Sequence, residues 1–117
     1  MEWTLVKSKL LDKTYSGCKF DKNSEIREVL ETPEMENGEF KIKISKTGTS
    51  IKISMEMLKK VFEATIENKN KYNKGVLYNL YPKEVDTNSC YVYSVGQLFE
   101  YIGVMSKEDK RNFVIIK

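Results

Sequence analysis

Lysine, tyrosine and carboxylate side chains are the groups through which this chain of 117 residues could do chemistry, because it contains no histidine. The absence of histidine excludes Ser–His and Cys–His nucleophilic pairs, histidine general bases and histidine-containing zinc sites. The two cysteines, Cys18 and Cys90, lie far apart in the chain without the partner spacing of a zinc site. We therefore predict neither a metal site nor a cofactor.

Asp21 precedes Glu39 and Lys41, which begin a predicted hairpin strand. An acid followed by Glu-x-Lys resembles the PD-(D/E)xK class of metal-dependent nucleases. This resemblance implies that the carboxylates would hold Mg²⁺ and that the lysine would support the attacking water. The Pro-Asp that opens the pattern is missing, so the nuclease stays an alternative to a noncatalytic protein. The segment from Lys46 to Ser50 reverses the order of a Walker A phosphate loop and indicates a hairpin turn.

The first element that must position such residues is a two-faced β-hairpin over residues 40 to 54. Phe40 and four isoleucines occupy alternate positions, while lysines occupy the opposite parity, so one face is apolar and the other basic. Residues 19 to 20 and 25 to 32 also have extended patterns, and residues 32 to 38 indicate a loop. The first 54 residues therefore predict an antiparallel meander of three or four strands.

The apolar period changes from 2 to 3.6 after Ser54, which is a favourable N-cap. The change predicts an amphipathic helix over residues 55 to 68 that covers the isoleucine face of the hairpin. A second long helix is expected from Asn88 or Ser89 to Gly103, followed by a strand over residues 113 to 116 that returns to the sheet. We predict a single α+β domain over residues 1–117, in which 1–54 is mainly β and 55–117 is mainly helical with a terminal strand.

The order helix, short helical turn, helix, strand is typical of a winged helix-turn-helix, whose last helix lies in a DNA major groove. Polar residues on the outer side of the second long helix would then face base edges, and lysines would approach phosphates. The same residues are equally typical of a solvated surface. The predicted nucleic-acid contacts are Lys41, Lys43, Lys46, Lys52, Lys69, Lys71, Tyr72, Lys74, Ser89, Tyr93, Ser94 and Gln97.

Short motifs spread over most of the chain carry a resemblance to known domains. Tyr15-Ser16-Gly17 with Phe20, then Ser45-Lys46-Thr47-Gly48, and Asn88-Ser89-x-Tyr91-Val92 resemble uncharacterised small bacterial and phage domains, often found near restriction-type genes. The resemblance implies a β-meander joined to a helical, DNA-associated module, and it carries over no catalytic residue. The first predicted function is therefore a small noncatalytic DNA-binding accessory module.

A protein-binding inhibitor or adaptor is the alternative function. Residues 21 to 39 carry seven acids, which could mimic phosphate, whereas residues 40 to 74 carry nine lysines. The chain has seven tyrosines, a residue type favoured at interfaces. The predicted protein contacts are Tyr78, Tyr81, Tyr93, Tyr101, Glu28, Glu31, Glu34 and Glu36.

The chain has no apolar run near the ~20 residues that span a bilayer. Its start alternates charged and apolar residues and lacks the continuous apolar segment of a signal peptide. We expect a cytoplasmic protein whose partner is DNA or a host or defence protein rather than a membrane.

Overall fold

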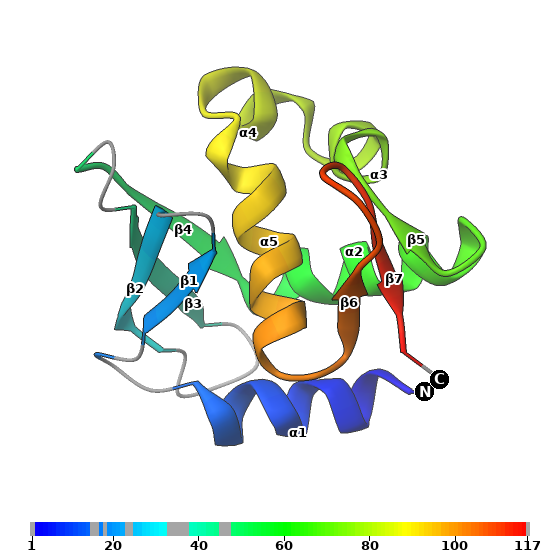
Figure 1. Cartoon of the computed structure of the whole chain (residues 1–117), viewed down its shortest axis with the longest axis horizontal. Coiled ribbons are helices and arrows are strands. Elements are labelled where there is room, and N and C mark those ends of the chain that lie inside the picture. Colours follow the sequence, from blue (N-terminus) through cyan, green and yellow to red (C-terminus); the bar gives the residue numbers. More distant parts are fainter. Residues whose placement is uncertain are drawn as a thin grey trace.

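A computed structural model describes residues 2–14, 17, 19–22, 25–32, 38–44 and 48–116. These residues contain five helices and seven strands, and the strands form two antiparallel sheets on opposite sides of a central helix (Figure 1). The predicted α+β class is confirmed.

The predicted meander is a sheet with the strand order β1-β2-β3-β4, here called sheet A. Its strands are β1 (Lys19–Lys22), β2 (Glu25–Glu31), β3 (Glu39–Ile44) and β4 (Ser50–Ser54). The alternation seen in the sequence places the apolar side chains of β3 and β4 on one buried face, together with Val29 of β2. The buried residues of that face include Val29, Phe40, Ile42, Ile44, Ile51 and Ile53.

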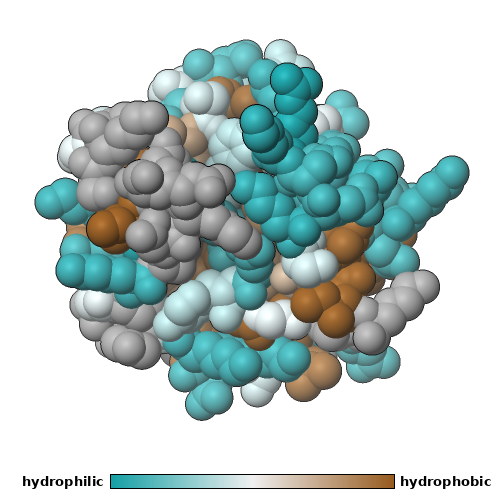
Figure 2. All heavy atoms as spheres, in the orientation of Figure 1, coloured by the Kyte–Doolittle hydropathy of each residue, from teal (hydrophilic) through white to brown (hydrophobic). Residues whose placement is uncertain are grey.

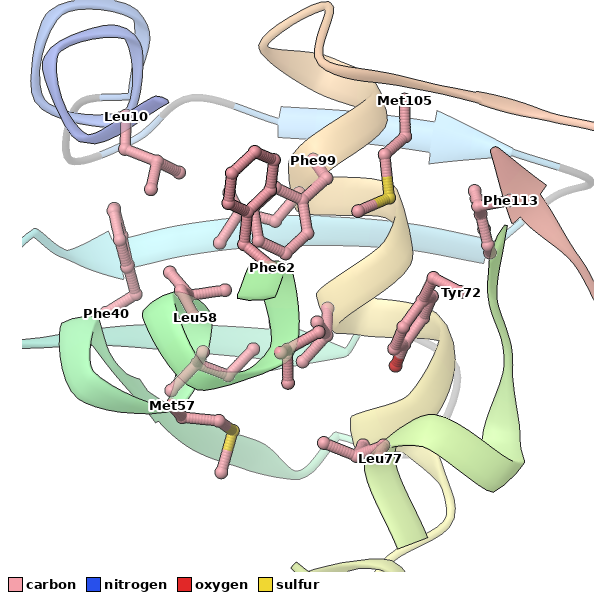
Figure 3. Close-up of a cluster of buried hydrophobic side chains, with 14 of the residues drawn as sticks. Leu10, Phe40, Met57, Leu58, Phe62, Tyr72, Leu77, Phe99, Met105 and Phe113 are labelled. Carbon is pink, nitrogen blue, oxygen red and sulfur yellow. The ribbon is translucent and has the colours of Figure 1, made fainter. Parts of the chain in front are cut away.

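The helix predicted after the hairpin is α2 (Met55–Glu67), and it begins where the sequence indicates. The hydroxyl of Ser54 accepts a hydrogen bond from the backbone N–H of Met57 over 3.0 Å, so the predicted cap is confirmed. Leu58 and Phe62 of α2 point into the core near Phe40 of β3 (Figure 3). The helix therefore covers the apolar face of sheet A, as predicted.

The second long helix is α5 (Cys90–Tyr101), which lies between the two sheets (Figure 1). Its Phe99 ring lies 6.2 Å from the Phe62 ring of α2, measured between centroids. Asn88 rather than Ser89 caps it, because the Asn88 Oδ1 accepts a hydrogen bond from the N–H of Cys90 over 2.9 Å while Ser89 makes no side-chain cap.

The second sheet, called sheet B, has the order β5-β7-β6. It contains β5 (Lys71–Tyr72), β6 (Met105–Lys107) and β7 (Phe113–Ile115). The terminal strand was predicted, but it pairs with β5 and β6 in this second sheet and does not return to the meander, and β5 and β6 were not predicted. β5 has two residues and β6 has three, too few to show an alternating pattern in the sequence. They are strands because both of them pair with β7.

Three helices complete the fold. The first is α1 (Trp3–Lys13), at the start of the chain. The short helical turn before α5 is a pair of helices, α3 (Lys74–Leu80) and α4 (Pro82–Thr87), which Pro82 separates. Proline lacks a backbone N–H and suits the first position of a helix, so it ends one helix and begins the next.

Candidate nucleic-acid interface

A groove of about 630 Å³ lies between the start of α3, the N-terminal half of α5 and the turn that joins β6 to β7. This turn covers residues 108 to 112 and is called the hairpin turn below. It lies beside α5 in Figure 1, and Figure 2 shows hydrophilic residues gathered over it. The groove is lined by Asn73, Lys74, Gly75, Val92, Tyr93, Arg111 and Asn112.

Asn73 holds the α3 side of the groove to the hairpin turn. Its Oδ1 accepts a hydrogen bond from the N–H of Val76 over 3.3 Å, which caps α3. Its Nδ2 donates to the Oδ1 of Asn112 over 3.0 Å, although the two residues are 39 positions apart. The wall of the groove that belongs to α3 is therefore fixed to the wall that belongs to sheet B.

Asp109 holds the hairpin turn in shape through hydrogen bonds to other residues of the turn. Its Oδ1 accepts hydrogen bonds from the backbone N–H groups of Arg111 and Asn112, over 2.8 and 2.9 Å. The Nδ2 of Asn112 also donates to this carboxylate at 3.0 Å. The hydrogen bond from the Arg111 backbone is the main reason that the pKa of Asp109 lies below its usual value. A charged Asp109 thus fixes Arg111 and Asn112 where they line the groove.

The groove has a positive rim. Lys74 and Arg111 line it and are both exposed to solvent. Lys71 lies on β5 next to them and forms an ion pair with Glu108 over 3.2 Å. Because Glu108 compensates Lys71, the cations that remain available to an anionic ligand within the groove are Lys74 and Arg111.

Tyr93 supplies the aromatic side chain of the groove, and 40% of its surface is exposed. Gly75 lies opposite on α3, where an added Cβ would come within 3.3 Å of the Asn73 Oδ1. The absence of a side chain at Gly75 therefore leaves room both for the Asn73 cap and for a ligand over this part of the groove.

The structure brings together two of the residues predicted to contact nucleic acid, Lys74 and Tyr93, and places Lys71 beside them. Lys69 and Ser89 are exposed outside the lining of the groove. Sequence reasoning missed Asn73, Arg111 and Asn112. The spacing of Asp109 and Asn112, both turn-forming residues that flank Arg111, was the signal that could have indicated an ordered turn here.

The predicted exposure of three other residues is wrong. Tyr72 and Ser94 are fully buried, and Gln97 is 8% exposed. The Tyr72 hydroxyl donates to the carbonyl of Val92 over 2.6 Å. The Oγ of Ser94 accepts a hydrogen bond from the Nε of Arg27 on β2. Helical spacing alone placed Ser94 and Gln97 on an outer face, but sheet A and sheet B cover most of α5.

The hairpin lysines lie away from the groove. Sheet A and β5 are on opposite sides of α5 (Figure 1), so Lys41, Lys43 and Lys52 do not share a surface with Lys74. In the strand register Lys43 is opposite Glu28 and Lys41 is opposite Glu31. The acidic and basic stretches of the sequence therefore meet as neighbours on one mixed-charge face. Lys46, Glu34 and Glu36 lie outside the described residues.

The predicted tyrosine patch is divided among several elements. Tyr78 is exposed on α3, and Tyr101 is exposed two turns after Tyr93 on α5. Tyr81 lies between α3 and α4, where partial burial raises its pKa and the charge of Lys60 on α2 opposes that rise. Tyr81 is therefore close to α2, whereas Tyr93 faces the groove.

The two acids of the nuclease pattern lie in different strands of sheet A. Asp21 pairs with Ile26 beside one end of β3, whereas Glu39 pairs with Ser54 at the other end. About five residues of β3 separate these positions, which corresponds to roughly 16 Å. The backbone does not bring them together to share a metal ion. Among the described residues, no group of three or more acid or cysteine side chains is arranged to hold one.

Comparisons of the chain with protein-family models, curated proteins and solved structures found no match. Within the described part of the chain, none of the helices has both the length and the apolar composition needed to cross a membrane.

Proposed function

We propose that this protein is a noncatalytic nucleic-acid-binding module, and that the groove between α3, α5 and the hairpin turn is its contact surface. One observation carries the proposal: Lys74 and Arg111, from separate elements, line the same groove as Tyr93, which is 40% exposed. Positive side chains bind phosphates and release counterions, and an aromatic ring supplies a surface for a base.

The order of elements in the second half of the chain resembles that of a winged helix. Helix α2 is followed by β5, by α3 and α4, by α5 and by the hairpin β6–β7, with β7 paired between β5 and β6. We interpret residues 55 to 116 as a winged-helix-like unit, in which the hairpin is the wing. On this interpretation the groove lies between the wing and the start of the last helix.

The test is binding of DNA at two salt concentrations, about 50 and about 200 mM. Two phosphate contacts correspond to a loss of roughly tenfold in affinity over this range. Lys74→Glu/Arg111→Glu should abolish binding at both concentrations. The matched control is Lys43→Glu/Lys52→Glu on sheet A, which changes the net charge equally and also tests the surface predicted from the hairpin.

The control variant should bind as the wild type does. No binding to single-stranded or duplex DNA at the lower salt concentration would refute the proposed function. Equal losses in the two double variants would refute the groove as the site, because a general charge effect would then explain the binding. Circular dichroism of both variants separates a lost contact from a lost fold.

A further inference from the structure

The surroundings of α5 limit the kind of nucleic acid that can reach it. Seven of its twelve residues are buried, including every residue from Ser94 to Phe99. Sheet A contacts it through Ser94, and Phe113 of sheet B packs directly on Gly96. A helix that enters a major groove, about 12 Å wide, must present a continuous outer face to the bases. With a sheet on each side, α5 does not offer such a face.

The part of α5 that remains open suits a single base. Tyr93 is 40% exposed and lines a groove of about 630 Å³, within the range of roughly 300–1,000 Å³ typical of small-ligand sites. Every base has an aromatic face that can stack on tyrosine, but a base paired within a duplex is already stacked on its neighbours. An unpaired base can therefore reach Tyr93 at a much smaller cost than a paired one.

The positive residues are placed for the backbone of the same nucleotide. Lys74 lies on the α3 side of the groove and Arg111 on the hairpin turn, and Tyr93 lines the groove with them. A guanidinium can form two parallel hydrogen bonds to phosphate, and an ammonium supplies a compact charge. Both charges are on the rim, where a sugar-phosphate chain could pass while its base points inward.

The amide groups of the groove are already used by the protein. Asn73 donates to Asn112, and Asn112 donates to Asp109. These contacts use part of the hydrogen-bonding capacity of both amides, so fewer polar groups remain to distinguish one base edge from another. Stacking and charge remain, and both are tolerant of sequence.

From these observations we infer that the groove holds an unpaired nucleotide of single-stranded DNA, its base stacked on Tyr93 and its phosphate beside Lys74 and Arg111, with little base preference. This inference rests on the proposed function and specifies its ligand.

The experiment measures binding of fluorescein-labelled oligo-dT of about 12 nucleotides and of the matching dA·dT duplex, by anisotropy at low salt. The single strand should bind at least about tenfold more tightly than the duplex. Tyr93→Ala should weaken binding of the single strand about tenfold, within the range for a lost base–aromatic stack. Tyr93→Phe should keep most of the affinity, because the ring remains.

Tyr78→Ala is the matched control, because Tyr78 is 41% exposed on α3 but does not line the groove. Its affinity should equal that of the wild type. Stacking and charge also have separate signatures: Tyr93→Ala should leave the salt dependence unchanged, whereas Lys74→Gln should reduce its slope by about 0.7.

Duplex binding as tight as single-strand binding, or an unchanged affinity in Tyr93→Ala, would overturn this inference and leave the proposed function standing. A complete absence of DNA binding would overturn both. An equal loss in Tyr93→Ala and Tyr78→Ala would also overturn the inference, since it would indicate a general effect of removing an exposed tyrosine.

Discussion

The Nε of Arg27 donates a hydrogen bond to the Oγ of Ser94 over 2.8 Å, across 67 positions of the sequence. Arg27 lies on β2 and is 1% exposed, and Ser94 in the middle of α5 is fully buried. This contact joins sheet A to α5 and occupies the face of α5 on which Ser94 lies. The side of α5 that the sequence assigns to DNA is thus partly an internal interface.

The Ser94→Ala substitution should destabilise the protein more than the small size of the serine side chain suggests. Ser94→Ala removes an acceptor from a buried guanidinium, which we expect to lower the free energy of unfolding by about 1–3 kcal/mol. Ser89→Ala is the control, because Ser89 is exposed and its side chain caps nothing; its change should stay within about 0.5 kcal/mol. Urea denaturation of both variants measures the difference. Equal midpoints would show that the Arg27–Ser94 hydrogen bond contributes nothing to stability.

Replacing Gly96 with alanine should destabilise the protein, whereas the same replacement at an ordinary helical glycine stabilises it. A glycine-to-alanine substitution inside a helix normally raises the free energy of unfolding by up to about 1 kcal/mol. A Cβ at Gly96, however, would lie 2.4 Å from a ring carbon of Phe113, which is itself 1% exposed and closely packed. We predict that Gly96→Ala costs about 1–3 kcal/mol in urea denaturation.

A smaller side chain at position 113 provides the check on that mechanism. Phe113→Leu leaves space for the new methyl group, so the double variant Gly96→Ala/Phe113→Leu should lose less stability than the sum of the two single variants. Strictly additive losses would contradict a steric clash between the two positions.

The parts of the fold that the sequence predicts are those whose signals are local. The isoleucine alternation on β3 and β4 defines a strand face by itself, and Ser54 caps α2 through a neighbour three residues away. Neither feature needs knowledge of the rest of the chain. For this reason sheet A and α2 could be predicted with their correct faces.

The features that the sequence did not predict depend on residues distant in the chain. β5 is a strand because Lys71 pairs with Val114, and Ser94 is buried because Arg27 reaches it from β2. One clue was present: Arg27 has the same parity in β2 as the buried Val29, which marks it as an inward-facing arginine. The groove likewise depends on a contact between Asn73 and Asn112, which no local pattern reveals.

The stability of the protein should fall at alkaline pH because of Tyr72. Burial raises the pKa of Tyr72 well above its ordinary value of about 10, and its hydroxyl donates to the Val92 carbonyl. The unfolded chain ionises this tyrosine near pH 10 while the folded chain keeps it neutral. Its contribution to stability is therefore complete below about pH 10 and is lost as the pH rises toward the folded pKa.

The Tyr72→Phe variant separates the effect of Tyr72 on stability at alkaline pH from the effects of the other tyrosines. At neutral pH the variant should lose about 1 kcal/mol with the hydrogen bond. Above about pH 10 its free energy of unfolding should fall less steeply than that of the wild type. Parallel curves for the wild type and Tyr72→Phe would contradict the raised pKa.

The hairpin turn should loosen at acid pH through Asp109. Because hydrogen bonds from Arg111 and Asn112 lower the pKa of its carboxyl group, its contribution is complete above about pH 4 and is lost as the pH falls through the lower folded value. NMR spectra should show the amide protons of Arg111 and Asn112 shifting together below about pH 4. A transition at or above the ordinary aspartate value would contradict these hydrogen bonds.

Asp109 also connects the hairpin turn to binding. Asp109→Ala should release Asn112 and Arg111 and weaken binding of oligo-dT several-fold at neutral pH. Asp109→Asn keeps an oxygen acceptor for the two backbone N–H groups, so it should retain most of the binding but lose the acid transition. Asp86→Ala, at an exposed position of α4, should change neither property. If Asp109→Asn and Asp109→Ala bind equally weakly, the negative charge rather than the shape of the turn is what positions Arg111.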